Sequence, residues 1–440
     1  MGVSTVHKAG RPFTVQATAV NGAATPATTT NYAGTATTTI GDCGPTPACV
    51  DVPAGTLTIG ANFVAGQLTS NVATYSDAGA IAVTLVDSTF AAVDAADGST
   101  AAEMNITTAS PVNVGRFVPD HFAVAYNTPS FATGCSAGTF TYVGQKFSYT
   151  TAPVITVTAQ NLSNATTTNY TGAVWQITNT SLTSKAYTAA SGSVDISGIT
   201  GTDPVIADSG NGTGTLTFGT GTGIFFTRNT PLAAFNAEVS LAINVIDTDG
   251  VAYASNPARF GQASAGNGIA FGSGKEMRFG RLAVRNANGS QLVPLPVRLE
   301  AQYAVTAGAG YIFVTNTADS CTSLANTNVQ MSAFTSNLTA CKTALTTTPV
   351  TLSGGRGMLI LPAPGNANNG SVLLTANLGA ASGTTCTVVN GSTVTATGAS
   401  STYLQGNWAG SASYADNPSA RATFGSVKGA DEVIYMRENF

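Results

Sequence analysis

Short runs in which apolar and polar residues alternate recur from one end of the chain to the other. In residues 80–87, Ile81, Val83 and Leu85 alternate with small or polar residues, and residues 239–245 repeat the pattern. Successive side chains of a β-strand point to opposite faces, so a period of two predicts strands with one buried face. Glycine- and proline-rich turn signals separate the runs, and long stretches at the helical period are absent from the sequence. The pattern predicts an all-β protein.

Four sequence blocks occur twice and in the same order, which indicates an internal repeat. The hexapeptide ATTTNY occurs at 27–32 and again at 165–170, preceded by FTVQATAVNGAATP in the first copy and by VITVTAQNLSN in the second. Further along, GTLTIG (55–60) matches GTLTFG (214–219), and AIAVTLVD (80–87) matches EVSLAINVID (238–247). Self-similarity of this kind predicts two copies of one domain, the second longer by insertions. Short strands at this spacing favour tandem immunoglobulin-like β-sandwich domains. We expect a first repeat over residues 1–113, a second over 114–275 and a C-terminal β-rich domain over 276–440.

The C-terminal domain opens with two alternating runs on either side of Asn288-Gly289. Asn-Gly is the dipeptide most typical of two-residue hairpin turns. We therefore expect a β-hairpin that turns at Asn288 and Gly289.

Composition restricts the function classes. Only 9% of residues are charged and the net charge is −4, so the chain carries no basic surface for nucleic acid or anionic lipid. No apolar run approaches the roughly 18 residues of a membrane helix, and the N-terminus lacks the apolar core of a signal peptide. We expect no transmembrane segment, and a C-terminal fragment of a larger protein that is exported by a signal outside this fragment.

The six cysteines permit full pairing, in many combinations. Cys43 and Cys49 flank a short Pro/Gly loop, and Cys321 and Cys341 share one stretch rich in Ser, Thr and Asn. We expect a local disulfide in each of these two pairs. By subtraction, Cys135 would then pair with Cys386. The alternative is six buried thiols in a cytosolic protein.

Candidate chemistry is sparse. Asp247 and Asp249, in the segment DTDG, could hold a structural calcium ion, although an ordinary hairpin turn uses the same residue types. Trp408 is flanked by turn residues and is a candidate ligand-facing aromatic platform, with core packing as the alternative. His121 lies beside Asp120, but no nucleophile motif accompanies the pair. We expect no catalytic residues and no cofactor, and therefore no enzyme.

Several segments together carry a resemblance to a known family. They are GRFVPDHFAV (115–124), FTYVGQKF (140–147), TAQNLSNATTTNYTG (158–172), FGRLAVRNANGSQLVPLPVRLEAQY (279–303), DSCT (319–322), LPAPGNANNGSVLLTANL (361–378) and ARATFGSVKGADEVIYMREN (420–439). In this order they resemble the C-terminal region of MshQ-like proteins. Met436 departs from the aromatic residue that the family pattern leads us to expect there. Members of this family are exported proteins encoded with the mannose-sensitive haemagglutinin type IV pilus system. The resemblance implies a pilus-associated or surface-anchored protein and supplies no catalytic residues.

Three functions follow as hypotheses from different classes. The leading one is a non-catalytic structural or adhesive module on the cell surface or pilus of a bacterium, with pilus or other cell-surface proteins as partners. The second is a lectin-like module that binds surface glycans, for which exposed aromatics should cluster at one loop end. The third, a secreted hydrolase, requires a pocket with converging acids.

Overall fold

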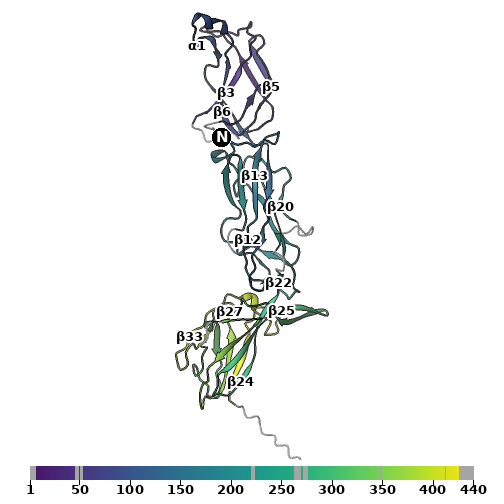
Figure 1. Ribbon diagram of the computed structural model, residues 1–440, viewed down its shortest axis with the longest axis vertical. Helices are drawn as coiled ribbons and strands as arrows, with labels where there is room; N and C mark the ends of the chain where they lie inside the picture. The colour runs from purple at the N-terminus through teal and green to yellow at the C-terminus, as the bar shows by residue number, and fades with distance from the viewer. Residues whose placement is uncertain are drawn as a thin grey trace, which may run out of the picture.

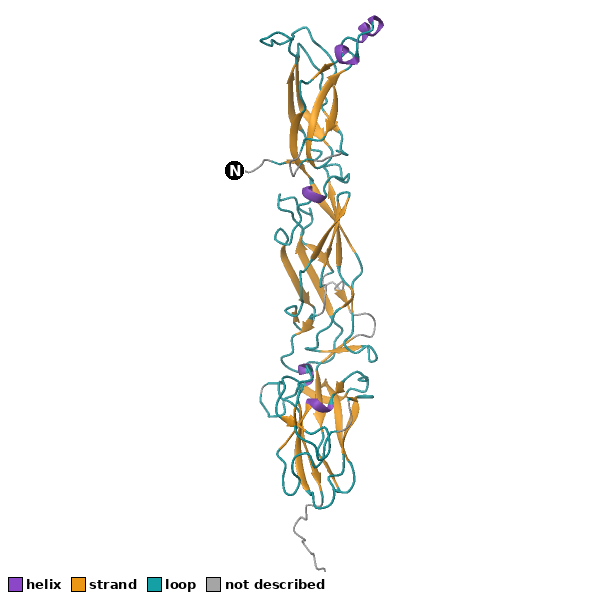
Figure 2. Cartoon of the chain, turned by 90° about the vertical axis from the view of Figure 1, so that its left-hand side faces the viewer, coloured by secondary structure: helices purple, strands orange, loops and turns teal. Residues whose placement is uncertain are grey.

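The computed structural model describes residues 6–44, 49, 53–219, 223–261, 269–270, 276–345, 349–411 and 413–425. Over these residues the chain forms three β-sandwiches: the first sandwich (residues 6–118), the second sandwich (119–270) and the third sandwich (276–425). They follow one another along a single long axis (Figure 1), and the perpendicular view shows the same line of strand-rich bodies (Figure 2). Helix is confined to α1 (Ala101–Met104) and to 3-10 turns such as η1 (Ala92–Asp97). The predicted all-β tandem fold is confirmed.

The first sandwich packs a three-stranded sheet, in the order β4-β5-β2, against the sheet β1-β8-β6-β3, in which β7 also pairs with β6. Its strands are β1 (His7–Lys8), β2 (Phe13–Thr18), β3 (Thr37–Gly41), β4 (Leu57–Thr58), β5 (Gln67–Tyr75), β6 (Gly79–Asp87), β7 (Ile106–Thr107) and β8 (Val112–Val118). The expected boundary at residue 113 cuts through β8, which is a sheet strand of the first sandwich. The chain passes from β8 to the next sandwich within two residues, so no linker composition marks the true boundary.

The second sandwich packs the sheet β16-β17-β13-β9 against the sheet β14-β19-β20, with β21 beside β19. Its strands are β9 (His121–Tyr126), β10 (Ser130–Phe131), β11 (Phe140–Tyr142), β12 (Tyr149–Thr151), β13 (Val154–Gln160), β14 (Thr183–Ala189), β15 (Val194–Asp195), β16 (Val205–Gly210), β17 (Thr213–Thr217), β18 (Phe225–Phe226), β19 (Glu238–Asn244), β20 (Ala258–Phe260) and β21 (Ile269–Ala270). Its core includes Phe122, Ile155, Val157 and Leu241, each at most 1% exposed.

The central strands of the first two sandwiches correspond to each other. β13 pairs with β17 as β2 pairs with β5, and β19 lies between β14 and β20 as β6 lies between β3 and β8. Both ATTTNY copies end in one contact, since the Tyr32 hydroxyl donates to Asp87 and the Tyr170 hydroxyl donates to Asp247, each at 2.7 Å. One of the four sequence matches was wrong. Residues 55–60 contain β4, whose counterpart beside β17 is β16, whereas residues 214–219 contain β17 itself.

The third sandwich packs the sheet β23-β25-β26, with β30 also beside β25, against the sheet β24-β34-β31-β28. Its strands are β22 (Glu276–Arg278), β23 (Gly280–Val284), β24 (Ala287–Gly289), β25 (Leu295–Ala307), β26 (Gly310–Thr315), β27 (Ser323–Leu324), β28 (Val329–Ser332), β29 (Val350–Thr351), β30 (Arg356–Leu361), β31 (Gly370–Ala376), β32 (Thr384–Thr385), β33 (Val394–Thr395) and β34 (Ser419–Phe424). β23 and β25 pair antiparallel as predicted, but the predicted turn at Asn288-Gly289 is wrong. That dipeptide lies in β24, which runs parallel to β34 in the opposite sheet.

Candidate functional site at the two joints between sandwiches

The first joint, between the first and second sandwiches, is centred on Asp77, which Ala78 separates from the start of β6. Its side chain is buried and accepts hydrogen bonds from the hydroxyl (2.9 Å) and N–H (3.1 Å) of Thr168 and from the N–H of Asn169 (3.0 Å). Burial raises the pKa of Asp77, against the opposing effect of these donors and of the Ala78 N–H. Thr168 and Asn169 belong to the second ATTTNY copy. The repeated hexapeptide is therefore the surface on which the preceding sandwich is held.

A second acid, Asp120, strengthens the same joint. It lies between β8 and β9, and its carboxylate binds the guanidinium of Arg11 and the ring of His121, while its carbonyl accepts from Lys8 Nζ at 2.6 Å. Burial acts to raise the pKa of Asp120, but hydrogen bonds from Arg11 and His121 and the charge of Lys8 outweigh it, so the pKa is lowered. The Asp120–His121 pair noted in the sequence thus contributes to the joint.

The proposed calcium ligands lie beside this joint, and both are engaged by protein groups. Asp247 Oδ2 accepts from the Tyr170 hydroxyl, and Asp247 Oδ1 accepts from the N–H groups of Asp249 and Val251, both at 2.9 Å. Asp249 forms an ion pair with Arg116 of the first sandwich. These contacts favour the turn alternative, in which the carboxylates organise the loop and bind the neighbouring sandwich.

The second joint, between the second and third sandwiches, is covalent. Cys135 forms a disulfide with Cys321, with the two Cα atoms 5.5 Å apart. Close by, β11 of the second sandwich pairs in parallel with β22, and the side chains of Phe140 and Tyr142 in β11 are buried in the core of the third sandwich. The segment 135–142 therefore belongs to the third sandwich in its packing, although it lies inside the second repeat in sequence.

Two of the three predicted disulfides were wrong. The pairs Cys321–Cys341 and Cys135–Cys386 do not form; instead Cys341 pairs with Cys386 inside the third sandwich. The prediction paired cysteines that are close in sequence. In the structure, the segment 135–142 packs on the third sandwich and so brings Cys135 to Cys321, which is 186 residues away in the chain.

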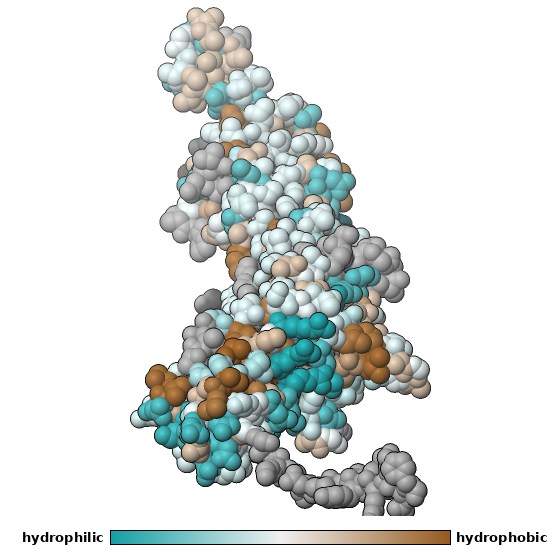
Figure 3. Space-filling view, turned by 60° about the horizontal axis from the view of Figure 1, so that its bottom comes forward, coloured by the Kyte–Doolittle hydropathy of each residue, from teal (hydrophilic) through white to brown (hydrophobic). Residues whose placement is uncertain are grey.

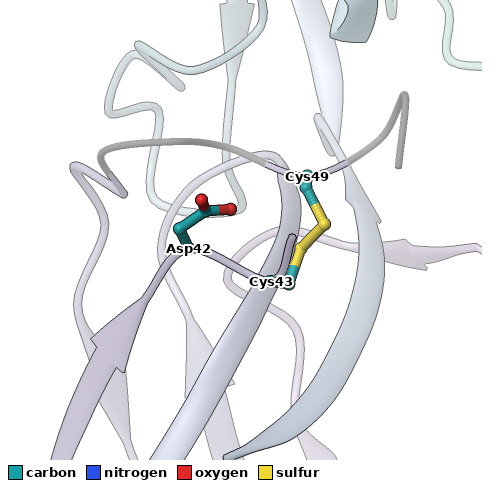
Figure 4. Close-up of side chains that lie close together, drawn as sticks. All are labelled: Asp42, Cys43 and Cys49. Atoms are coloured by element: carbon teal, nitrogen blue, oxygen red, sulfur yellow. A yellow bond between two sulfur atoms is a disulfide. The ribbon is translucent and has the colours of Figure 1, made fainter. Parts of the chain in front are cut away.

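The local pair Cys43–Cys49 forms as expected from its short loop. Asp42 lies beside it (Figure 4), and its carboxylate accepts the N–H of Gly44 at 2.8 Å. Because both sulfurs are held in the disulfide, this cluster offers no thiolate to a metal ion.

Buried polar contacts surround the second disulfide. The Tyr142 hydroxyl donates to Asp319 Oδ2 and accepts from the side-chain amide of Asn316, both at 2.8 Å. Burial raises the pKa of Tyr142 well above its ordinary value, so the hydroxyl keeps its proton and its role as donor. Tyr142 and Asp319 lie in segments that carry the family resemblance, but no spacing in the sequence links them, because the partners of Tyr142 lie about 175 positions away in the chain.

Arg228, which sequence analysis also missed, is a third bridge at the second joint. Its guanidinium donates to the carbonyl oxygens of Tyr414 (2.7 Å), Gln405 (2.6 Å) and Gly280 (2.9 Å) and lies 4.3 Å from the centroid of the Phe279 ring. Burial lowers the pKa of Arg228 to about 10, which still leaves it charged near neutral pH. A recess of about 610 Å³ adjoins it, and among the described residues that line this recess Arg228 is the one that carries a charge. These lining residues include no pair of acids for hydrolytic chemistry.

Trp408 lies on the third sandwich and is 38% exposed. The guanidinium of Arg281 sits 4.7 Å from the centroid of its ring, so part of the ring is already covered by a cation–π contact. Seen from the lower end of the molecule, exposed apolar side chains form several separate patches beside strongly hydrophilic ones (Figure 3). The same guanidinium lies 3.9 Å from the centroid of the half-buried Phe313 ring, so Trp408 and Phe313 contact one cation between them.

Comparison with protein families identifies two DUF6701 domains in tandem. The model of the third DUF6701 domain matches residues 77–268, and the model of the fourth matches residues 278–439. No curated protein matches the chain. The third-domain match begins at the Asp77 joint and therefore includes β6 and β8 of the first sandwich. Among the described residues, no helix is long and apolar enough to cross a membrane.

Proposed function

We propose that this chain is a non-catalytic stalk module, which keeps three sandwiches in line and holds other parts of a surface assembly at a fixed distance. One observation carries the proposal: both joints are built from buried, directional contacts, and the second joint is closed by the Cys135–Cys321 disulfide.

Domains in one chain usually move relative to each other unless their interface is large or specific. Here a buried carboxylate, Asp77, is satisfied only by donors from both sandwiches, so bending at the first joint would remove three of its four hydrogen bonds. A buried acceptor left without its donors costs about 1–3 kcal/mol. At the second joint, any rotation must keep the Cys135–Cys321 bond and the β11–β22 ladder intact. The contacts therefore oppose hinge motion at both places.

The proposed setting is the surface or pilus of a bacterium, outside the cytoplasm. The similarity to MshQ-like proteins supports a pilus-associated role, with pilus or other cell-surface proteins as partners. Three disulfides and a surface of few charges suit a compartment in which thiols are oxidised. Carbohydrate binding has less support, because Arg281 already occupies part of the Trp408 ring.

The stalk proposal is tested by small-angle X-ray scattering of the purified chain under oxidising conditions. We expect a rod-like distance distribution that stays unchanged between low and high salt, because the joint contacts are buried. A distance distribution typical of sandwiches that move independently of one another would refute the stalk proposal. A glycan array, probed with and without calcium, is the matched test of the adhesive alternative, and saturable binding to one sugar would favour that alternative.

A further inference from the structure

The first sandwich has an open edge along β2. Among the described residues, β2 pairs only with β5, and an apolar groove follows its other side. Two adjoining recesses of about 280 and 430 Å³ make up this groove, and both are lined by Ala17, Leu85, Thr108 and Val112. Val112 is 57% exposed in it. A strand edge with free backbone groups beside an apolar groove is a typical acceptor for an added strand.

The second sandwich shows what fills this place in its own copy of the fold. There, β9 runs antiparallel to β13 over six residue pairs, from Gln160 opposite His121 to Ile155 opposite Tyr126. β13 is the counterpart of β2, so the open edge of β2 corresponds to the edge that β9 covers. No strand at this position is present among the described residues of the first sandwich.

The side chains of β13 are more deeply buried than their counterparts in β2. In β13 the inward-facing side chains of Ile155, Val157 and Ala159 are fully buried. Their counterparts in the first sandwich, Val15, Ala17 and Ala19, are only partly buried. The core of the first sandwich is correspondingly divided into two small clusters instead of one.

The groove also contains the position that a large side chain from such a strand would take. In the second sandwich, Phe122 of β9 packs on Tyr170, with the ring centroids 5.6 Å apart. The counterpart of Tyr170 is Tyr32, and Tyr32 lines the larger recess of the groove. Of the described residues that line the groove, Asp87 alone is charged, and Tyr32 already binds it. The groove therefore suits an uncharged strand with alternating apolar residues.

A second observation identifies what carries this strand. The first ATTTNY copy, at the free end of the first sandwich, is exposed at Thr30 and Asn31. The corresponding Thr168 and Asn169 hold the Asp77 carboxylate at the first joint. The free end thus presents the same receptor surface that binds a preceding sandwich elsewhere in the chain.

We propose that a preceding sandwich of the same kind docks on the first sandwich, and that the strand leaving it runs antiparallel to β2 and fills the groove. A second copy of this chain does not fit, because its own Asp77 and β9 are already engaged within its first joint and second sandwich. The direction is also suitable: a strand antiparallel to β2 ends beside Phe13, and the ring of His7 lies 5.5 Å from that of Phe13. The chain can therefore continue from such a strand into β1.

This inference would lengthen the proposed stalk by one unit, but it does not depend on the stalk function. Scattering from the unmodified chain tests stiffness, whereas occupation of the groove is measured at β2. The stalk proposal can therefore fail while the proposed strand in the groove is confirmed, and the reverse is also possible.

The strand is tested by fusing the sequence of residues 120–127, DHFAVAYN, with a short Gly-Ser linker ahead of the full chain. We expect the amides of residues 14–20 to exchange with solvent at least about tenfold more slowly, and the first sandwich to melt at a higher temperature. The control is the same extension with its phenylalanine and valine replaced by serine. Ala17→Glu, which places a charge in the groove, should abolish the protection, and its own stability is measured without the extension. Absent protection, or equal protection by the serine extension, overturns the proposal.

The docking surface is tested by a duplicate of residues 6–127 placed ahead of the chain, so that a copied Asp77 meets the first ATTTNY copy. Slower exchange of the amides of Thr30 and Asn31 is expected. Asp77→Ala in the duplicate alone should reverse it. Unchanged exchange in the duplicate with its aspartate intact would overturn the assignment of the occupant to a preceding sandwich.

Discussion

Removal of the disulfide at the second joint should both destabilise the third sandwich and loosen its attachment. The double substitution Cys135→Ser and Cys321→Ser leaves the β11–β22 ladder and the contacts of Tyr142 in place. It therefore isolates the contribution of the covalent link.

The expected size follows from the loop that the disulfide closes. The two cysteines are 186 residues apart, but the folded second sandwich spans most of that distance. When the third sandwich unfolds alone, the flexible part of the loop runs from the end of the second sandwich to Cys321, about 45–50 residues. In the chain-entropy description, closing a loop of this length is worth about 4 kcal/mol. For a domain of this size, the loss lowers the melting temperature by about 8–16 °C.

The chain offers a matched control in Cys341–Cys386, which closes a loop of 45 residues entirely inside the third sandwich. Calorimetry should show a similar fall in melting temperature when either disulfide is removed. Scattering should show a more flexible chain only when Cys135 and Cys321 are changed. If loss of Cys341–Cys386 loosened the chain equally, or loss of Cys135–Cys321 left both melting and flexibility unchanged, the covalent joint would not have the role we assign to it.

Three further changes probe the first joint and the repeat. Asp77→Ala leaves the N–H of Asn169 without its acceptor and should weaken the joint by about 2–4 kcal/mol, read as faster amide exchange at Asn169; unchanged exchange would contradict the role of Asp77. Because the pKa of Asp120 is lowered in the folded chain, its stabilisation is complete above about pH 4 and is lost as the pH falls through the folded pKa. Thermal melting below about pH 4 should therefore depend less on pH in Asp120→Asn, and an identical pH profile would argue against this ion pair. Tyr170→Phe removes a donor from the buried Asp247 and should cost about 1–3 kcal/mol in urea unfolding, whereas a neutral effect would show that the contact is dispensable.

The fold was largely predictable because its signals are local. Alternation over residues 80–87 and 239–245 identified the strands β6 and β19, and the ATTTNY copies identified the repeat. The match of residues 55–60 with 214–219 failed for a physical reason. Two neighbouring strands of one sheet both require residues that suit a pleated, half-buried surface, so both can carry the same tetrapeptide. Asn288-Gly289 failed because a parallel pairing with β34, 135 residues away, fixes that dipeptide in a strand.

The joints were not predictable from local pattern, because each is made by residues far apart in the chain. Asp77 meets Asn169 across 92 positions, and Cys135 meets Cys321 across 186. Neither contact has a period or a spacing motif. Asp120 and Asp249 were noticed only as candidates for catalysis and calcium binding, since sequence alone does not show that Arg11 and Arg116 come from the neighbouring sandwich.

The two joints differ in a way that bears on how such a chain could be extended. The second joint depends on an inserted segment, a parallel ladder and a disulfide that have no counterpart among the described residues of the first joint. The first joint has no inserted segment: it combines an acid before β6, the second ATTTNY hexapeptide, the ion pairs of Asp120 and Asp249, and a chain that passes directly from one sandwich into the next. The ATTTNY receptor occurs in both copies, whereas the acid does not: counting back from the matched Asp87 and Asp247, the place of Asp77 is taken by Ala237 in the second copy. A joint of this kind can therefore be formed again only by a copy that carries the acid. A joint with an inserted, covalent element is particular to one place. The first sandwich carries the same hexapeptide with Thr30 and Asn31 exposed, which is why we propose that a further sandwich docks at that end.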